Sequence, residues 1–355
     1  IMDSQIYQRA INLDGNSITS KLAQFVFYGS KDVVTGYDGS GTPVSSTLTS
    51  PLAYPFAEAD TPNAGDGSPE KPFLIETIIH LLNVNTLYEG NLQGGQPTLR
   101  YVTPGNPSQV YGLNFKLTEN IDLSSDNGGM SLNRPLCSIG QGFDGIFNGN
   151  GKALFDIKPT QSITHAGIFA KITTFGEVKN LLIGNFNVST GGEYAGALAG
   201  EVNNGAVITN VKTTDDAAFN PSTGRTISSD KYAGGLVGYL NTGAKIIDCE
   251  MKTITVVSLF DEYISDVNTY IPGGAGGLVG SIGQNKNQQG ARASVENSKT
   301  ENIMLNCKYA SGGLVGSLVS GEDTEETEVN ASIKGSTATN ISYDESESAA
   351  YIGGV

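Results

Sequence analysis

The sequence of 355 residues contains no tryptophan, two histidines and three cysteines, and only 16% of its residues are charged. An average soluble domain has about 25% charged residues and about 7% glycine, so the low charge and the 46 glycines disfavour a helical bundle. The 36 acidic residues outnumber 21 basic ones, and the net charge of −15 repels nucleic acid and anionic membrane surfaces. No stretch approaches the ~20 apolar residues of a membrane span. We therefore expect neither a nucleic-acid partner nor a span in this chain.

The small number of cysteines and histidines restricts which disulfide, zinc and nucleophilic sites the chain can form. Cys137, Cys249 and Cys307 cannot all pair and lack the spacing of a zinc cluster or a redox pair, so we expect small buried apolar groups. His80 and His165 cannot form an HExxH zinc motif, and neither accompanies a GxSxG nucleophile. The sequence thus predicts no catalytic residue, no metal centre and no cofactor.

Incidental calcium binding is the exception that we keep open. Residues 14–16, 125–128 and 261–266 offer carboxylate and amide oxygens, but none forms an EF-hand loop or a nonapeptide series. The acidic run at 322–328 is predicted to be a solvated loop, because clustered like charges usually stay hydrated.

A glycine phrase recurs along the chain, and its fullest copy, Tyr-Ala-Gly-Gly-Leu-Val-Gly, stands at 232–238. The spacings between copies are 29, 38, 42, 36 and 41 residues. A unit of about 29 residues with insertions is typical of a stacked array, and we expect the insertions to leave it at one corner. The six aligned glycines are Gly167, Gly196, Gly234, Gly276, Gly312 and Gly353.

Each unit also contains two short segments rich in β-branched residues, such as 208–211 and 253–256. These segments are too short for helices, and their apolar-polar alternation is typical of strands. About three short strands per unit predict an all-β chain, a parallel β-solenoid (β-helix). We expect right-handed coils because connections between parallel strands are right-handed.

Two sets of residues are predicted to hold the repeat together. Adjacent glycines let neighbouring coils approach closely and let the chain turn at positive φ. A polar residue recurs where the chain must bend, and Asn and Asp tolerate left-handed geometry. These glycines lack the context of a dinucleotide or Walker phosphate loop, which favours a structural role. The polar residues are Asn180, Asn210, Asp248 and Asn297.

The chain divides into three parts. Residues 1–62 form an N-terminal β-rich or irregular segment with a strand at 24–28, whereas 63–160 and 161–355 are the entry and the repeats of one solenoid. In the entry, 113–123 and 139–152 are predicted to be early coils. The apolar spacing of Ile75, Ile78, Ile79 and Leu82 predicts a short amphipathic helix that covers the open end of the stack.

The glycine phrase resembles the GLUG motif of surface proteins from gut Bacteroidetes, which also occurs in the non-catalytic region of bacterial immunoglobulin A metallopeptidases. Phrases at 67–75, 115–123 and 143–152 are similar as well, so the resemblance covers about 63–355. It implies the scaffold, but without HExxH it does not imply zinc chemistry. Two departures are Lys171 in place of the last motif glycine and Ala197 in place of the second.

The two ends of the sequence carry further expectations. The chain starts with Ile-Met and lacks a signal segment, so we expect that the native N-terminus has been removed. The sixth copy ends at Val355, which suggests that the chain stops inside a coil.

The resemblance implies an extracellular or outer-membrane surface location, with a lipid anchor in the full-length precursor. We expect a non-enzymatic cell-surface adhesin or structural stalk that binds glycans, or host or neighbour-cell proteins, through solenoid loops. Tyr194, Tyr232 and Tyr351 share one aligned position with His165 and are the candidate binding residues, although stacked rings are also ordinary packing.

The alternative is a polysaccharide lyase or glycoside hydrolase on the same scaffold. Acids on successive coils could converge, since glycosidase carboxylates stand about 5 to 9.5 Å apart. Solvated surface charge is the more ordinary explanation of such acids. The candidates in the insertions are Asp215, Asp216, Asp261, Glu262 and Asp266.

Overall fold

The structure is a computed structural model. It describes residues 32–37, 43–47, 56–57, 65, 67–89, 92–93, 96–97, 101–102, 110–124, 132, 134–138, 142–159, 164–173, 176–203, 205–216, 218–219, 224–241, 243–259, 273–283, 292–308, 310–319, 331–344 and 351–353.

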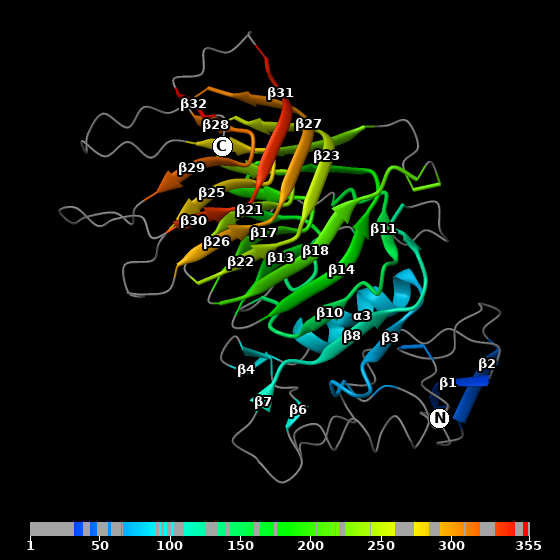
Figure 1. The fold of residues 1–355 in the computed structure, drawn as a ribbon. Helices are drawn as coiled ribbons and strands as arrows, with labels where there is room; N and C mark the ends of the chain where they lie inside the picture. The colour runs from blue at the N-terminus through cyan, green and yellow to red at the C-terminus, as the bar shows by residue number, and fades with distance from the viewer. Residues whose placement is uncertain are drawn as a thin grey trace.

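The described chain is almost entirely β-structure, and its strands stack in three parallel sheets that form the faces of a solenoid (Figure 1). The six-stranded sheet runs in chain order through β12 (His165–Ala166), β16 (Tyr194–Gly196), β20 (Tyr232–Gly234), β24 (Gly274–Gly276), β28 (Ala310–Gly312) and β32 (Tyr351–Gly353). The five-stranded sheet runs through β13 (Phe169–Ile172), β17 (Ala199–Val202), β21 (Val237–Leu240), β25 (Val279–Gly283) and β29 (Val315–Val319).

The third sheet, which we call the wide sheet, contains 15 strands and includes the entry segments. Its presence alongside the other two confirms the all-β parallel solenoid, while the handedness of the coils stays a prediction. Its strands are β3 (Phe73–Ile75), β8 (Asn114–Leu117), β9 (Ile121–Asp122), β10 (Ile146–Asn148), β11 (Ala153–Phe155), β14 (Glu177–Ile183), β15 (Phe186–Ser189), β18 (Val207–Thr213), β19 (Arg225–Ser229), β22 (Lys245–Ile247), β23 (Glu250–Ser258), β26 (Ala293–Glu296), β27 (Lys299–Cys307), β30 (Ala331–Lys334) and β31 (Thr337–Tyr343).

Each repeat contributes strands to three sheets, but these strands do not coincide with the three strands predicted from the sequence. The glycine phrase supplies two strands, as in β20 and β21, because the chain reverses between Gly234 and Val237 and enters another sheet. The second and third predicted segments both belong to the wide sheet, where a left-handed residue bends the chain without ending the ladder.

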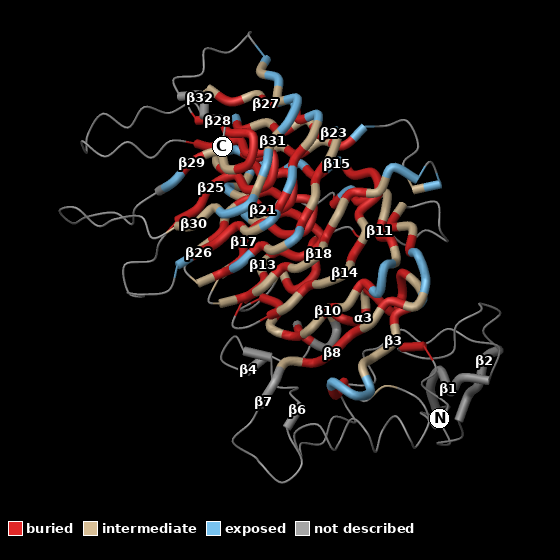
Figure 2. The backbone as a smooth tube through the Cα atoms, viewed as in Figure 1, coloured by how far each residue is buried: buried red, intermediate tan, exposed pale blue. Residues whose placement is uncertain are grey.

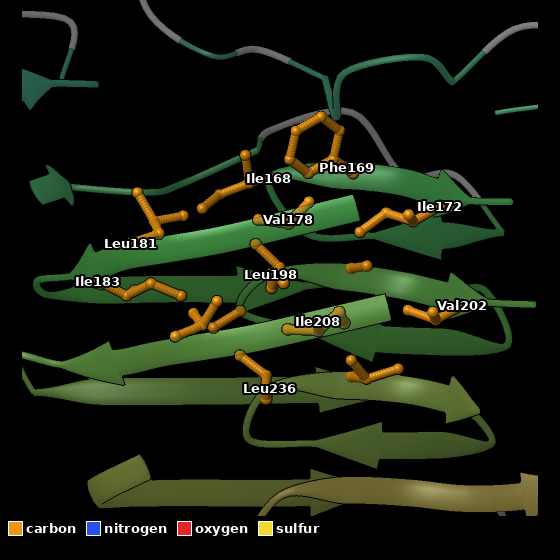
Figure 3. Close-up of a cluster of buried hydrophobic side chains, with 14 of the residues drawn as sticks. Ile168, Phe169, Ile172, Val178, Leu181, Ile183, Leu198, Val202, Ile208 and Leu236 are labelled. Atoms are coloured by element: carbon orange, nitrogen blue, oxygen red, sulfur yellow. The ribbon is translucent and has the colours of Figure 1, made fainter. Parts of the chain in front are cut away.

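Columns of aliphatic side chains fill the interior of the coils. Ile168, Leu198 and Leu236 lie one above another in Figure 3, facing a second column that includes Val178 and Ile208. All five are completely buried, and Figure 2 shows the buried interior continuing through the stack. Burial of each Leu or Ile side chain stabilises the fold by about 1.5–3 kcal/mol, so a unit that lacked neighbours would leave its core exposed.

The polar residues at the bends have the predicted left-handed conformation. The φ angles of Asn180, Asn210, Asp248 and Asn297 are 53°, 53°, 56° and 49°. The Asn210 Nδ2 donates to Asn180 Oδ1 at 2.9 Å, so consecutive bends are also joined by side chains.

The glycine phrase differs from the prediction in one respect. The positive-φ glycines in the described residues are Gly67, Gly142, Gly151, Gly205, Gly224, Gly243 and Gly335, and they include none of the six aligned ones. The expectation of a positive-φ turn in the phrase is therefore wrong, and close approach of the backbone is the reason for its glycines.

A helix is present at the predicted place as α3 (Ile78–Glu89), beside β3 and β8 at the lower end of the stack in Figure 1. The predicted amphipathic character is wrong, because residues 78–81 and 83–84 are all buried and so the helix is covered on more than one face. Thr77 caps its N-terminus, since Thr77 Oγ1 accepts a hydrogen bond from the His80 backbone N–H at 3.4 Å. The inclusion of Ile75 in the helix is wrong, because Ile75 belongs to β3 and pairs with Leu117. Tyr88 packs against Phe143 at 5.2 Å between ring centroids, which joins the helix to the core.

The N-terminal segment contains β1 (Asp32–Tyr37) and β2 (Pro43–Thr47), which pair antiparallel. The strand predicted at 24–28 lies outside the described residues. Phe56 stacks on Phe73 of β3 with 4.5 Å between ring centroids. A residue before the predicted boundary at 62 therefore packs on the solenoid.

Two short hairpins that were not predicted from the sequence follow α3. They are formed by β4 (Leu92–Gln93) with β5 (Gln96–Pro97), and by β6 (Tyr101–Val102) with β7 (Val110–Tyr111).

The longer connections of the solenoid leave it at several corners. Some follow strands β18 and β23 of the wide sheet, after Thr213 and Ser258. Others follow β25 and β29 of the five-stranded sheet, after Gly283 and Val319. The expectation of a single corner is wrong, because any turn between in-register strands can take up extra residues without disturbing the ladder.

Candidate functional site

The predicted tyrosine stripe begins as a column on the six-stranded sheet. His165, Tyr194 and Tyr232 are in register on three consecutive coils. The next two positions of the same column are Gly274 and Ala310, and Tyr351 follows them in register. The side chain of Tyr351 lies outside the described residues, so the stripe is defined only for its first three members.

A tyrosine from the neighbouring sheet completes an aromatic cluster, defined here as His165, Tyr194, Tyr232 and Tyr239. The Tyr239 ring stacks on Tyr194 at 5.2 Å and on Tyr232 at 5.6 Å between centroids. The Tyr194 ring is nearly parallel to that of Tyr232, and His165 lies 4.9 Å from Tyr194. The cluster therefore ties the six-stranded sheet to the five-stranded sheet across three coils.

A buried carboxylate lies beside the aromatic cluster. Glu201 Oε2 lies 3.1 Å from His165 Nε2 and 3.1 Å from Lys171 Nζ. Glu201 Oε1 accepts a hydrogen bond from Asn203 Nδ2 at 2.8 Å. These partners compensate for removing the carboxylate from water, which would otherwise be costly.

The register corrects one predicted departure from the motif. Lys171 pairs with Glu201, and Phe169 pairs with Ala199. Lys171 therefore does not replace the last motif glycine, Gly200; Ala170 occupies that place, because the first copy is one residue shorter at its turn. Lys171 belongs instead to an outer column that continues through Glu201 to Tyr239.

The environment fixes the protonation of this region at neutral pH. Burial raises the pKa of Glu201, but the hydrogen bond from His165 and the charge of Lys171 outweigh it, and the pKa falls to about 2. Burial raises the pKa of Tyr239 to about 12, and burial together with the nearby Glu193 raises the pKa of Tyr194 further. At neutral pH the Glu201 carboxylate is therefore an anion, and the phenols of Tyr194 and Tyr239 are neutral.

The aromatic cluster is mostly packed inside the molecule. Tyr232 is only 3% exposed, and Lys231 Nζ lies 5.3 Å from its ring centroid. Tyr194 and Tyr239 are half-buried. A ligand could therefore reach the edges of Tyr194 and Tyr239 but not a ring face of Tyr232.

The aligned glycines bring the six-stranded and five-stranded sheets, which we call the narrow sheets, close together. A Cβ atom on Gly234 would lie 1.9 Å from Val237 O and 2.5 Å from Gly280 N. A Cβ atom on Gly276 would likewise lie 1.9 Å from Val279 O. Backbone atoms occupy the space that a side chain would need, so these positions accept only glycine.

The acids considered for an enzyme do not form a shared site among the described residues. Asp215 Oδ1 lies 3.5 Å from Arg225 Nη1. Asp216 Oδ1 accepts a hydrogen bond from the Ala218 N–H at 3.0 Å, which is a turn contact. Asp261, Glu262 and Asp266 lie outside the described residues, as do the segments 14–16, 125–128 and 322–328.

The two histidines are engaged in the scaffold. His80 is buried in α3, where its Nδ1 accepts a hydrogen bond from the Glu76 N–H at 3.2 Å. His165 contacts Glu201, as described above. The three cysteines are buried and form no disulfide bond, and burial raises the pKa of the Cys249 thiol to about 12.

Arg225 is a buried cation that the sequence analysis missed. It takes the inward position that Phe186 occupies one coil earlier, and it is 3% exposed. Its Nη1 donates to Lys252 O at 2.8 Å, its Nε donates to Gly184 O at 3.2 Å, and its Nη2 donates to Thr214 O. Burial lowers the pKa of this guanidinium. These three backbone carbonyl oxygens stabilise the positive charge of the buried guanidinium.

Two furrows run along the outer face of the wide sheet, each above a column of left-handed residues. The charged furrow has a volume of about 490 Å³ and is lined by Asn210, Lys212, Asp248, Cys249, Glu250, Asn297 and Lys299. The neutral furrow has a volume of about 410 Å³ and is lined by Gly224, Arg225, Thr226, Thr253, Ile254, Thr255, Asn302, Met304, Asn340 and Ser342.

The described ranges contain neither a metal-binding cluster nor a membrane-spanning helix. There, no three His, Cys, Asp or Glu residues gather in a way that could hold a metal ion. In the same part of the chain, no helix has both the length and the apolar character needed to cross a membrane.

Comparison with known proteins gave partial likenesses. No family model matches the chain. Over 153 residues, or 41% of this chain, it is 34% identical to a protein of Evansella cellulosilytica provisionally named a Gly-rich membrane protein, and it spans only 15% of that protein's length. A crystal structure from Bacteroides ovatus, provisionally named an immunoglobulin A1 protease, aligns over 81% of this chain and 86% of its own, with a TM-score of 0.46 and 16% identity.

Proposed function

We propose that this chain is a non-enzymatic scaffold of a cell-surface adhesin or structural stalk of the GLUG type. One observation carries the proposal. From β12 to β32, the coils stack in register, and among the described residues His165, Glu201 and Arg225 are engaged in contacts within the stack. Such an array suits a rigid support better than it suits acid-base chemistry.

The location and the ligand follow from the resemblance described above. The protein acts at an extracellular or outer-membrane surface, as part of a precursor with a lipid anchor. Its partners are glycans or proteins of a host or neighbouring cell. The side chains on the outer face of the wide sheet and the connections after Thr213, Ser258, Gly283 and Val319 form the surface that meets them.

A binding screen and an activity assay together test this proposal. The protein should bind members of a glycan array or intact cells, and it should release no new reducing ends or unsaturated products from the glycans that it binds. Turnover of a bound glycan would overturn the non-enzymatic proposal in favour of a lyase or hydrolase. Absence of binding to glycans, cells and cell-surface proteins would leave only the stalk function.

A further inference from the structure

The neutral furrow is built from two columns of residues on strands β19, β23, β27 and β31. In Figure 1, β23, β27 and β31 lie side by side on the face of the wide sheet. The outer column is in register from coil to coil and consists of Thr226, Thr255, Met304 and Ser342. The bend column lies two residues earlier in the chain and consists of Gly224, which precedes β19, and of Thr253, Asn302 and Asn340, with φ angles of 76°, 54°, 57° and 53°.

Thr253 is the unusual member of the bend column. Glycine and asparagine adopt positive φ readily, whereas a β-branched residue there is strained. Gly224, Asn302 and Asn340 show that the fold accepts the easier residues at this position. Thr253 is also exposed, so core packing does not account for it. A strained, exposed side chain in a furrow indicates a role in binding.

The described lining of the furrow presents hydrogen-bonding groups and contains no exposed charged residue; the exposed Asp215, 3.5 Å from Arg225 Nη1, is not part of this lining. In the described lining, the only charged residue is Arg225, whose guanidinium is buried against three carbonyls. Asn340 Nδ2 donates to Asn302 Oδ1 at 3.0 Å, which leaves the Asn302 amide group as a donor and the Asn340 carbonyl as an acceptor. The hydroxyls of Thr253 and Thr255 make no hydrogen bond to any described residue.

Met304 gives the same surface an apolar centre. It is 47% exposed, although it stands in register between Thr255 and Ser342 on a polar face. An exposed thioether between hydroxyls offers dispersion contact to the C–H face of a ligand, while the hydroxyls and amides around it bond to the ligand's polar groups.

We propose that the neutral furrow binds a neutral polysaccharide chain lying along the axis of the solenoid. This proposal rests on the proposed function and names its ligand class. The neutral lining and the net charge of −15 disfavour a polyanionic glycan. The backbone groups beneath the furrow are engaged in parallel ladders, which disfavours an added peptide strand. Equivalent groups recur at the ~4.8 Å strand spacing and suit a ligand with its own short repeat.

Methyl NMR of the full chain provides a direct test. With ¹³C-methyl methionine, Met304 reports on the furrow, and Met251, which is fully buried in the same strand system, is the internal control. The probes are hexasaccharides of neutral glucan, mannan and xylan, with a polygalacturonate fragment and a neutral Gly-Ser-Thr peptide as comparisons. A neutral oligosaccharide should shift the Met304 signal and leave Met251 in place. A Met304 signal that responds to none of the neutral sugars, or to the peptide or the polyanion alone, overturns the proposal.

Two variants in the furrow and one control variant outside it separate this inference from the proposed function. Thr253→Asn should raise the melting temperature by relieving the strain, yet weaken oligosaccharide binding at least about tenfold, or ~1.4 kcal/mol. Thr255→Glu should also weaken binding, whereas Thr209→Glu, outside both furrow linings, should not. If Thr255→Glu still binds the array glycans as tightly as the unmodified chain, the furrow is not the site, although the adhesin proposal stands. If the bound sugar is cleaved, the furrow stands and the non-enzymatic proposal fails.

Discussion

The ring of Tyr194 lies almost parallel to that of Tyr232 on the next coil, with 5.8 Å between centroids and 10° between planes. Because Tyr239 stacks on both from another sheet, the three rings join two faces of the solenoid. A stripe predicted for ligand binding thus lies largely within the packing. Substitutions of these tyrosines can therefore test whether they serve mainly in packing or in ligand binding.

Replacing Tyr232 by Ala should destabilise the fold by roughly 3 kcal/mol, because it empties a buried ring site between two other rings. Tyr232→Phe keeps the ring and should change stability by less than about 1.5 kcal/mol. Urea unfolding followed by circular dichroism measures both. If the Tyr232→Ala protein kept its stability but no longer bound glycans, the original prediction that the tyrosines form the binding site would be supported instead.

The Glu201 carboxylate should contribute to the free energy of unfolding at neutral pH and lose this contribution at acid pH. Its pKa is lowered from an ordinary 4.5 to about 2, so the unfolded chain takes up the proton first as the pH falls. The contribution is therefore complete above about pH 4.5 and is lost between that value and about pH 2; it amounts to roughly 3 kcal/mol.

The comparison of Glu201→Gln with the unmodified chain isolates this effect. The variant should be less stable at pH 7, and the difference from the unmodified chain should shrink as the pH falls from 4.5 towards 2. Glu119→Gln serves as the control, since Glu119 is exposed and lies 3.9 Å from Lys152. A constant difference across this pH range would show that the buried carboxylate is not the group that titrates.

Gly234→Ala should destabilise the solenoid by about 3 kcal/mol or more, because the added methyl group meets the backbone of Val237 and Gly280. Gly224→Asn is the matched control: a Cβ atom added at Gly224 would meet no other atom within 4 Å, and Asn tolerates its φ of 76°. Thermal unfolding compares the two. Equal melting temperatures would contradict the close approach of the narrow sheets.

At the bend, Asn210→Ala should cost about 1–2 kcal/mol for left-handed geometry and about 1 kcal/mol for the lost hydrogen bond to Asn180. Asn210→Gly loses the same hydrogen bond but tolerates the φ of 53°, so it should be more stable than the Ala variant. Chemical denaturation of the two proteins measures the difference. An Ala variant as stable as the Gly variant would mean that the bend relaxes to another conformation.

The sequence by itself determined the stacked β-architecture, the capping helix and the left-handed bends. Each of these depends on local chemistry that recurs with the repeat: glycine where only hydrogen fits, Asn or Asp where φ is positive, and aliphatic residues between them. The six glycines were therefore recognisable as one column before any contact was known.

Only the tertiary structure decided which side chains meet. Tyr239 and Glu201 belong to a different sheet from Tyr194, and their proximity depends on a chain reversal at the glycines that spacing alone does not specify. The strain at Thr253 and the burial of Arg225 could not be predicted from the sequence either. A β-branched residue is ordinary in a strand, and the insertion before Arg225 hides its alignment with Phe186. The repeat sets the register, but the contacts between faces depend on how three sheets close around one core.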